Sequence, residues 1–233
     1  MKILGGSMDR DFSFDPGSDV MRSRAKEIGN KMKICFWIEI IEIIAPILLI
    51  IVSTGRIFSA VMGGNFTQAE NEVLSLNMIV GIAVVVLSII YAIILISLEK
   101  YDNNFKYAGL LYIAVQVTSL VKTFTSGSIL AFAMGLVNIA VTLGFVKLFI
   151  DALATSTRLV NRVIATSLEA YVNWYMFFAL ASIICTFAAF IPIINLFAAL
   201  ASIVIFIGSI VIAIWRLVLL WQAASAMQRH GKY

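Results

Sequence analysis

Charged residues are scarce in this sequence. They make up 13% of the 233 residues, whereas 61% are hydrophobic. A soluble domain typically has about 25% charged and 45–50% apolar residues. So little polar surface cannot cover apolar runs of this length. The composition therefore excludes a water-soluble globular protein and indicates that lipid surrounds most of the chain.

Histidine is almost absent, and the usual enzyme motifs are missing with it. The single histidine, His230, lies near the C-terminal end, so neither a histidine metal site nor a histidine-activated nucleophile is expected in the core. Neither G-x-S-x-G nor a phosphate-binding Gly-Lys-Ser/Thr sequence occurs. Cys35 and Cys185 lie inside separate apolar runs and are expected to be buried packing residues. We therefore predict a protein that is not an enzyme and has no cofactor or metal.

What the sequence does contain is a series of long apolar runs. A helix needs about 20 residues to cross the hydrocarbon core, and backbone groups in lipid must pair within the helix. We predict an all-α, polytopic integral membrane bundle of six transmembrane helices. The predicted spans cover residues 34–53, 77–98, 107–122, 128–150, 173–193 and 196–222. The third span is the shortest and most polar, and a re-entrant or interfacial segment is the alternative for it.

The polar segments complete the predicted domain plan, in which residues 21–222 form the membrane domain. Residues 1–20 are predicted to be a flexible N-terminal tail and residues 223–233 a cytoplasmic C-terminal tail. Residues 54–76 form an outer loop in this plan. Residues 151–172 are too polar to span, so we expect a helix that leaves the fourth span and lies at the membrane interface.

Lysine and arginine set the expected orientation, because cytoplasmic loops carry an excess of them. With the N-terminus inside, all but two of the 17 basic residues fall on the cytoplasmic side, the exceptions being Arg56 and Lys122. We predict a multi-pass protein of the bacterial plasma membrane with both termini cytoplasmic. The net charge of +4 has this origin and does not indicate a nucleic-acid partner. The expected partner is the bilayer, with other membrane subunits or a second copy as open alternatives.

Two carboxylates lie inside the first span. Glu39 and Glu42 are three residues apart and share one helix face, roughly 8–12 Å inside the apolar boundary at 1.5 Å per residue. A charge near the bilayer centre costs at least about 2.5–3.5 kcal/mol, so such groups usually face the bundle and have partners. Lys147 and Arg216 lie at similar depth in the fourth and sixth spans. We predict an intramembrane polar cluster of these four residues. It is either a structural ion pair with snorkelling bases or a path for protons or cations.

Weaker signals concern packing and symmetry. Asn138 and Gln116 lie inside spans and are expected to join helices or to line a polar path. The sequence Ser-Leu-Glu at 97–99 recurs at 167–169, an offset of 70 residues. The recurrence suggests three helical hairpins that each enter from the cytoplasm, although reuse of common interfacial residues explains it equally well.

Two classes of function fit these features. The first is a non-enzymatic accessory or partner-binding component of an envelope or transport system. The alternative is a small ion-coupled transporter or channel that uses the Glu39/Glu42 face of the first helix. A cavity that reaches Glu39 from the cytoplasm would favour transport, whereas a dry, fully paired cluster would favour the accessory component.

Overall fold

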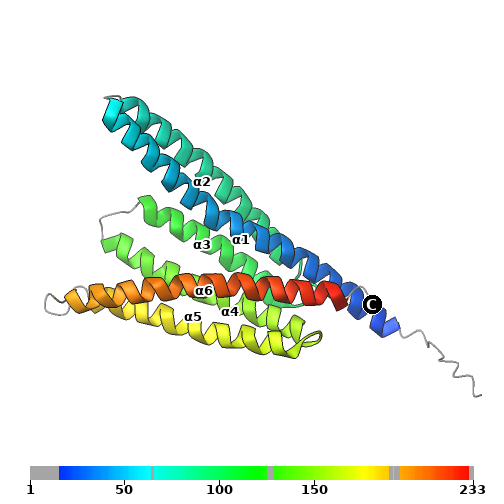
Figure 1. The fold of residues 1–233 in the computed structure, drawn as a ribbon. Coiled ribbons are helices and arrows are strands. Elements are labelled where there is room, and N and C mark those ends of the chain that lie inside the picture. The colour runs from blue at the N-terminus through cyan, green and yellow to red at the C-terminus, as the bar shows by residue number, and fades with distance from the viewer. Residues whose placement is uncertain (1–15, 64–65, 125–128, 189–190, 192–194, 231–233) are drawn as a thin grey trace, which may run out of the picture.

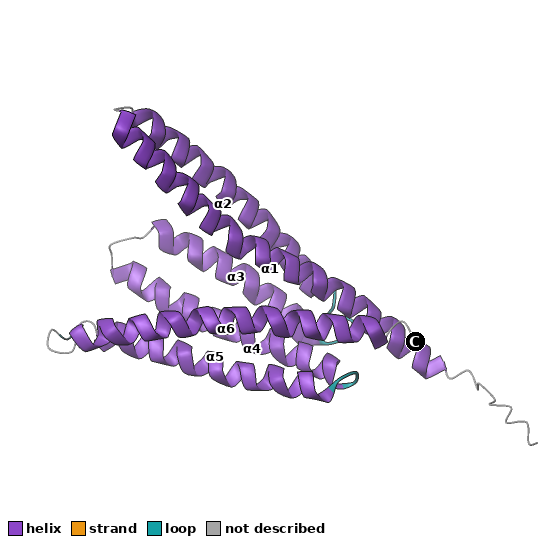
Figure 2. Ribbon diagram, in the orientation of Figure 1, coloured by secondary structure: helices purple, strands orange, loops and turns teal. Residues whose placement is uncertain are grey.

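The computed structural model describes residues 16–63, 66–124, 129–188, 191 and 195–230, and within them the chain is helical and has no strands (Figure 2). The helices are α1 (Pro16–Gly63), α2 (Phe66–Ile96), α3 (Asn103–Phe124), α4 (Ile129–Arg158), α5 (Arg162–Ala188) and α6 (Asn195–His230). The predicted fold class, a helical membrane bundle, is confirmed.

Five of the helices are long and apolar enough to cross a membrane. The segments that qualify are Asp19–Arg56, Val73–Ile96, Phe132–Arg158, Arg162–Ala188 and Leu200–His230. The chain is therefore built as a multi-pass membrane protein. The helix outside this set is α3, which has 22 residues and contains Asn103, Asn104, Lys106 and Gln116. A sixth crossing by α3 stays a prediction.

Each helix runs past at least one end of its predicted span. The predicted outer loop 54–76 is largely helical, because α1 continues to Gly63 and α2 begins at Phe66. The predicted tails are also shorter: α1 begins at Pro16 and α6 ends at His230. Proline suits the first helical turn, because its missing N–H has no helical acceptor there. Residues 1–15 lie outside the described residues.

The predicted interfacial helix at 151–172 is wrong, because α4 and α5 share this segment and meet at a turn at residues 159–161. Asn161 sets the start of α5: its side-chain oxygen accepts from the backbone N–H of Val163 at 3.0 Å and of Ile164 at 3.2 Å. Asp102 acts similarly at α3, where it accepts from the Asn104 N–H at 2.8 Å. Such caps satisfy amides that the helix leaves without partners, so both turns follow from local sequence.

The six helices form a closed ring in which each packs against its sequence neighbours and α6 returns to α1. Two glycines permit close approach at the junctions. A Cβ on Gly29 would lie 2.9 Å from the Ala224 carbonyl oxygen of α6, and one on Gly109 would lie 2.9 Å from the Ala92 carbonyl oxygen of α2. Side chains at these two positions would force the helices apart, so the small residues set the spacing of the ring.

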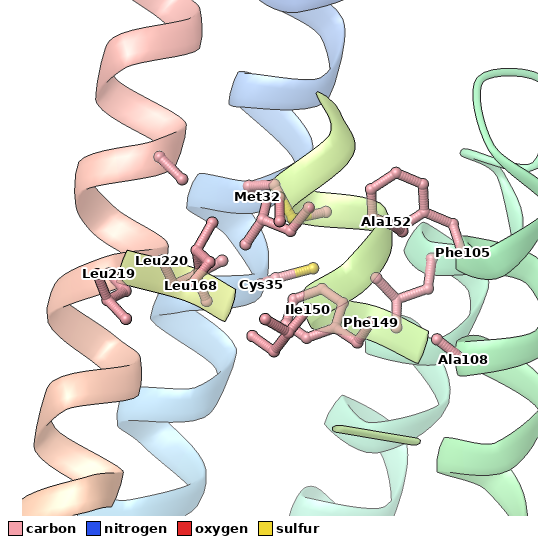
Figure 3. Packing of buried hydrophobic residues seen from close by; sticks show 14 of the residues in the cluster. Met32, Cys35, Phe105, Ala108, Phe149, Ile150, Ala152, Leu168, Leu219 and Leu220 are labelled. Carbon is pink, nitrogen blue, oxygen red and sulfur yellow. The ribbon is translucent and has the colours of Figure 1, made fainter. Parts of the chain in front are cut away.

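The buried core occupies the end of the bundle that is predicted to be cytoplasmic. There Met32 and Cys35 of α1 lie among Ile150 of α4 and Leu220 of α6, all at 1% exposure or less (Figure 3). Toward the other end, the α1–α2 hairpin diverges from the remaining helices (Figure 1). The bundle is therefore tightly packed at one end and open at the other.

The structure does not support the suggested repeat at its matching residues. Residues 97–101 form the turn between α2 and α3, whereas residues 167–171 lie within α5. Leu98 and Leu168 are both fully buried, but they occupy different local structures. A duplication of helical hairpins therefore stays a prediction.

Candidate functional site

The centre of the site is an ion pair between α1 and α6. Glu39 is 3% exposed, and one carboxylate oxygen accepts from Arg216 Nε at 3.1 Å and lies 2.9 Å from Nη2. Its other oxygen accepts from the Tyr91 hydroxyl of α2 at 2.7 Å. Both oxygens are thus engaged, and the compensating charge lies in direct contact, as burial of a charge requires.

Glu42 lies one turn further along α1 and is bound differently. Its carboxylate accepts from the Ser88 hydroxyl at 2.8 Å and from the Tyr112 hydroxyl at 2.7 Å. Ser88 and Tyr112 are both buried, so α2 and α3 each supply a donor from the interior. No cationic side chain forms an ion pair with Glu42 among the described residues. The two acids share a face and have chemically different partners.

Lys147 does not join this cluster. It lies exposed on α4, and the described ion pairs do not connect it with Glu39 or Glu42. The inward face of α4 is occupied instead by Phe145, Phe149 and Ile150, each at 3% exposure or less. Because helix faces repeat every 3.6 residues, Lys147 points away from a face set by these residues.

Asn138 joins α4 to α3. Its amide nitrogen, which has two hydrogens to donate, lies within hydrogen-bond distance of three acceptors on α3: the Val115 carbonyl at 3.1 Å, the Thr118 hydroxyl at 2.7 Å and the Ser119 hydroxyl at 2.9 Å. Gln116, the other predicted polar residue, is half-buried on α3 and makes no side-chain hydrogen bond to a described residue. Asn138 therefore has the geometry of an interhelical connection.

A cavity of about 580 Å³ lies beside the ion pair, lined by α4, α5 and α6 and by Ile43 of α1. Arg216, Tyr171 and Tyr175 line one part of it, and Ser202 and Thr186 line the part nearer the end of α5 and the start of α6. The residues that line the cavity include neither Glu39 nor Glu42. The cavity therefore borders the guanidinium and neither of the acids.

A second polar cluster, absent from the sequence analysis, connects α1 with the turn between α2 and α3. Glu27 accepts from Lys100 at 2.8 Å and from the Tyr101 hydroxyl, and Lys31 lies 2.9 Å from it. Arg24 donates to the Tyr101 carbonyl at 2.7 Å. The Glu27 carboxylate raises the pKa of Lys100, because it accepts a hydrogen bond from the charged amine. The sequence signal for this cluster was Lys100 next to Tyr101 in a very short connection between two apolar runs.

The described residues bring no three histidine, cysteine, aspartate or glutamate side chains together in a way that would hold a metal. No protein-family model, curated protein or solved structure matches this chain. The site must therefore be interpreted from its own chemistry: a neutralised ion pair, a second acid held by hydroxyl groups, and a cavity that ends at an arginine.

Proposed function

We propose that the protein is a non-enzymatic integral membrane component that acts by binding other membrane proteins, as an accessory part of an envelope or transport system. The observation that carries this proposal is the outer half of the α1–α2 hairpin, which diverges from the other helices (Figure 1). Its side chains are large, apolar and exposed on both helices, among them Ile47, Ile51, Met78, Ile79 and Ile82 at 50% exposure or more.

Such a hairpin presents two helix surfaces within the bilayer without support from the rest of the bundle. Helices associate in membranes through close packing, so a surface of this kind suits the transmembrane helices of a partner. The ion pair between Glu39 and Arg216 agrees with a structural role. Glu39 is paired and buried at the packed end of the bundle, where it fastens α1 to α6.

Photo-cross-linking in native membranes tests this proposal. A photoreactive amino acid at Ile51 or Ile79 should give protein adducts of discrete mass. The same group at Ile184, an exposed apolar position on α5, is the matched control and should give lipid adducts only. Lipid adducts alone at all three positions would contradict partner binding through the hairpin.

One observation favours the alternative of a small ion-coupled transporter or channel. Glu42 is half-buried and accepts hydrogen bonds from two neutral hydroxyls, and an acid inside a helical span without an ion-pair partner among the described residues is a candidate carrier of a proton or a small cation. Purified protein in liposomes decides between the two classes. The accessory component should add no proton or cation flux above protein-free liposomes, whereas flux lost in Glu42→Gln would establish transport.

A further inference from the structure

The cavity beside Arg216 has the size and lining of a ligand site. Its volume of about 580 Å³ falls within the roughly 300–1,000 Å³ of small-molecule pockets. From Arg216 to Ser202 it follows α6 for 14 residues, which corresponds to about 21 Å at 1.5 Å per residue. The cavity is therefore long as well as large, and it has a polar group at one end.

Hydrogen-bond donors without acceptors gather at that end. Arg216 directs Nε and Nη2 at Glu39, while Nη1 has no acceptor among the described residues. The hydroxyls of Tyr171 and Tyr175 also make no hydrogen bond to a described residue, although Tyr171 is only 1% exposed. These three donor groups line one cavity without an acceptor in the described part of the chain, so together they can serve an acceptor group that enters it.

The remaining walls suit a hydrocarbon chain. Ile139, Leu143, Phe178, Ile205 and Ile212 line the cavity beyond the arginine. Two of the hydroxyl groups in these walls are already satisfied by their own helix: Thr142 donates to the Asn138 carbonyl at 2.7 Å, and Ser209 to the Phe206 carbonyl at 2.7 Å. These two hydroxyls therefore need no polar ligand. Ser182 and Ser202 add polar groups to walls that are otherwise mostly apolar, so this part of the cavity can hold an apolar chain.

We propose that this cavity binds an anionic amphiphile, with a carboxylate or phosphate head at Arg216, Tyr171 and Tyr175 and an apolar chain along α4, α5 and α6. A guanidinium presents donors along two edges, so one edge can hold Glu39 while the other holds the ligand head. The head then lies toward the predicted cytoplasmic side and the chain extends toward the opposite side, which is the orientation of a lipid in the inner leaflet. Glu39 does not line this site, and the site is separate from the hairpin surface of the proposed function.

Ligand binding to the full chain in dodecyl maltoside micelles tests the proposal. The probes are palmitate, hexadecyl phosphate and hexadecanol, followed by native mass spectrometry and by the thermal midpoint Tm. One molecule of palmitate or hexadecyl phosphate should bind and raise the Tm, because a ligand that binds only the folded state stabilises it. The preferred head group identifies a fatty acid or a phosphate lipid as the source. Equal binding of hexadecanol would overturn the anionic head.

Three variants locate the site. Ala179→Phe places a ring in the cavity and should abolish binding, whereas Leu180→Phe on the exposed face of the same helix should leave binding unchanged. The double variant Tyr171→Phe with Tyr175→Phe preserves both rings and should weaken binding of the acids about tenfold or more. If Ala179→Phe and the double tyrosine variant both bind like the wild type, the ligand lies elsewhere and the proposal is wrong.

Discussion

Glu39→Gln is the most informative single perturbation of the bundle. Glu39 is 3% exposed and contacts Arg216 at 2.9 Å, so the neutral amide leaves a largely buried guanidinium without its counter-charge. Removal of one partner from a buried pair costs about 3–5 kcal/mol. At about 2–4 °C per kcal/mol for a chain of this size, Tm in detergent should fall by about 6–20 °C.

Glu42→Gln is the matched control, because its partners Ser88 and Tyr112 are neutral and no unpaired charge results. We expect a loss of about 1–2 kcal/mol, the range for one disturbed buried hydrogen bond. The double variant Glu39→Gln with Arg216→Met should recover part of the single-variant loss, because it removes the stranded charge. Equal losses for the two glutamine variants, together with additivity in the double variant, would refute the reasoning.

Three further predictions concern the ring, the turn cluster and the orientation. Gly29→Ala should lower stability by about 1–3 kcal/mol through overpacking against α6, measured as Tm, whereas Gly55→Ala, which meets no atom within 4 Å, should be neutral or stabilising. Lys100→Gln should lower Tm by an amount that is constant between about pH 6 and 9. Because Glu27 raises the pKa of Lys100, the stabilisation by Lys100 is fully present below its unfolded-state pKa of about 10.4 and is lost as pH rises through its folded-state pKa. A Tm difference between Lys100→Gln and the wild type that persists above the folded-state pKa would contradict the pair. A cysteine at Val163, which is 76% exposed, should react with an impermeant maleimide only after permeabilisation; reaction in intact cells would contradict the cytoplasmic assignment.

The pairing of charges inside the membrane could be predicted from the sequence, because an unpaired charge in lipid is costly. The direction in which each side chain points from its helix could not. Glu39 and Arg216 could be grouped because two opposite charges at equal depth have few alternatives to each other. Lys147 was grouped with them on depth alone, but the apolar residues Phe145 and Phe149 decide which face of α4 points inward. Ser88 and Tyr112 could not be identified, because 46 and 70 residues separate them from Glu42 and hydroxyl groups are common in membrane helices.

Helix lengths, too, could be predicted only in part from the sequence. Hydropathy marks where a chain can lie in lipid, whereas backbone hydrogen bonds and packing decide where a helix ends. Ala223, Ala224 and Met227 belong to the predicted tail, yet each is fully buried, so α6 continues to pack beside α1 past the end of the predicted span. The buried small residues in an otherwise polar segment were a usable signal for this extension.

The pairing of the first helix with the last has a consequence for biosynthesis. Glu39 and Arg216 are 177 residues apart, and at about 5–20 residues per second the arginine is synthesised roughly 10–35 s after the acid. Tyr91 is synthesised much earlier, 52 residues after Glu39, and supplies a neutral hydrogen bond in the interval. The nascent α1–α2 hairpin thus carries its acids through membrane insertion with hydroxyl partners alone. The ion pair between α1 and α6 can therefore form only after almost the whole chain has been synthesised.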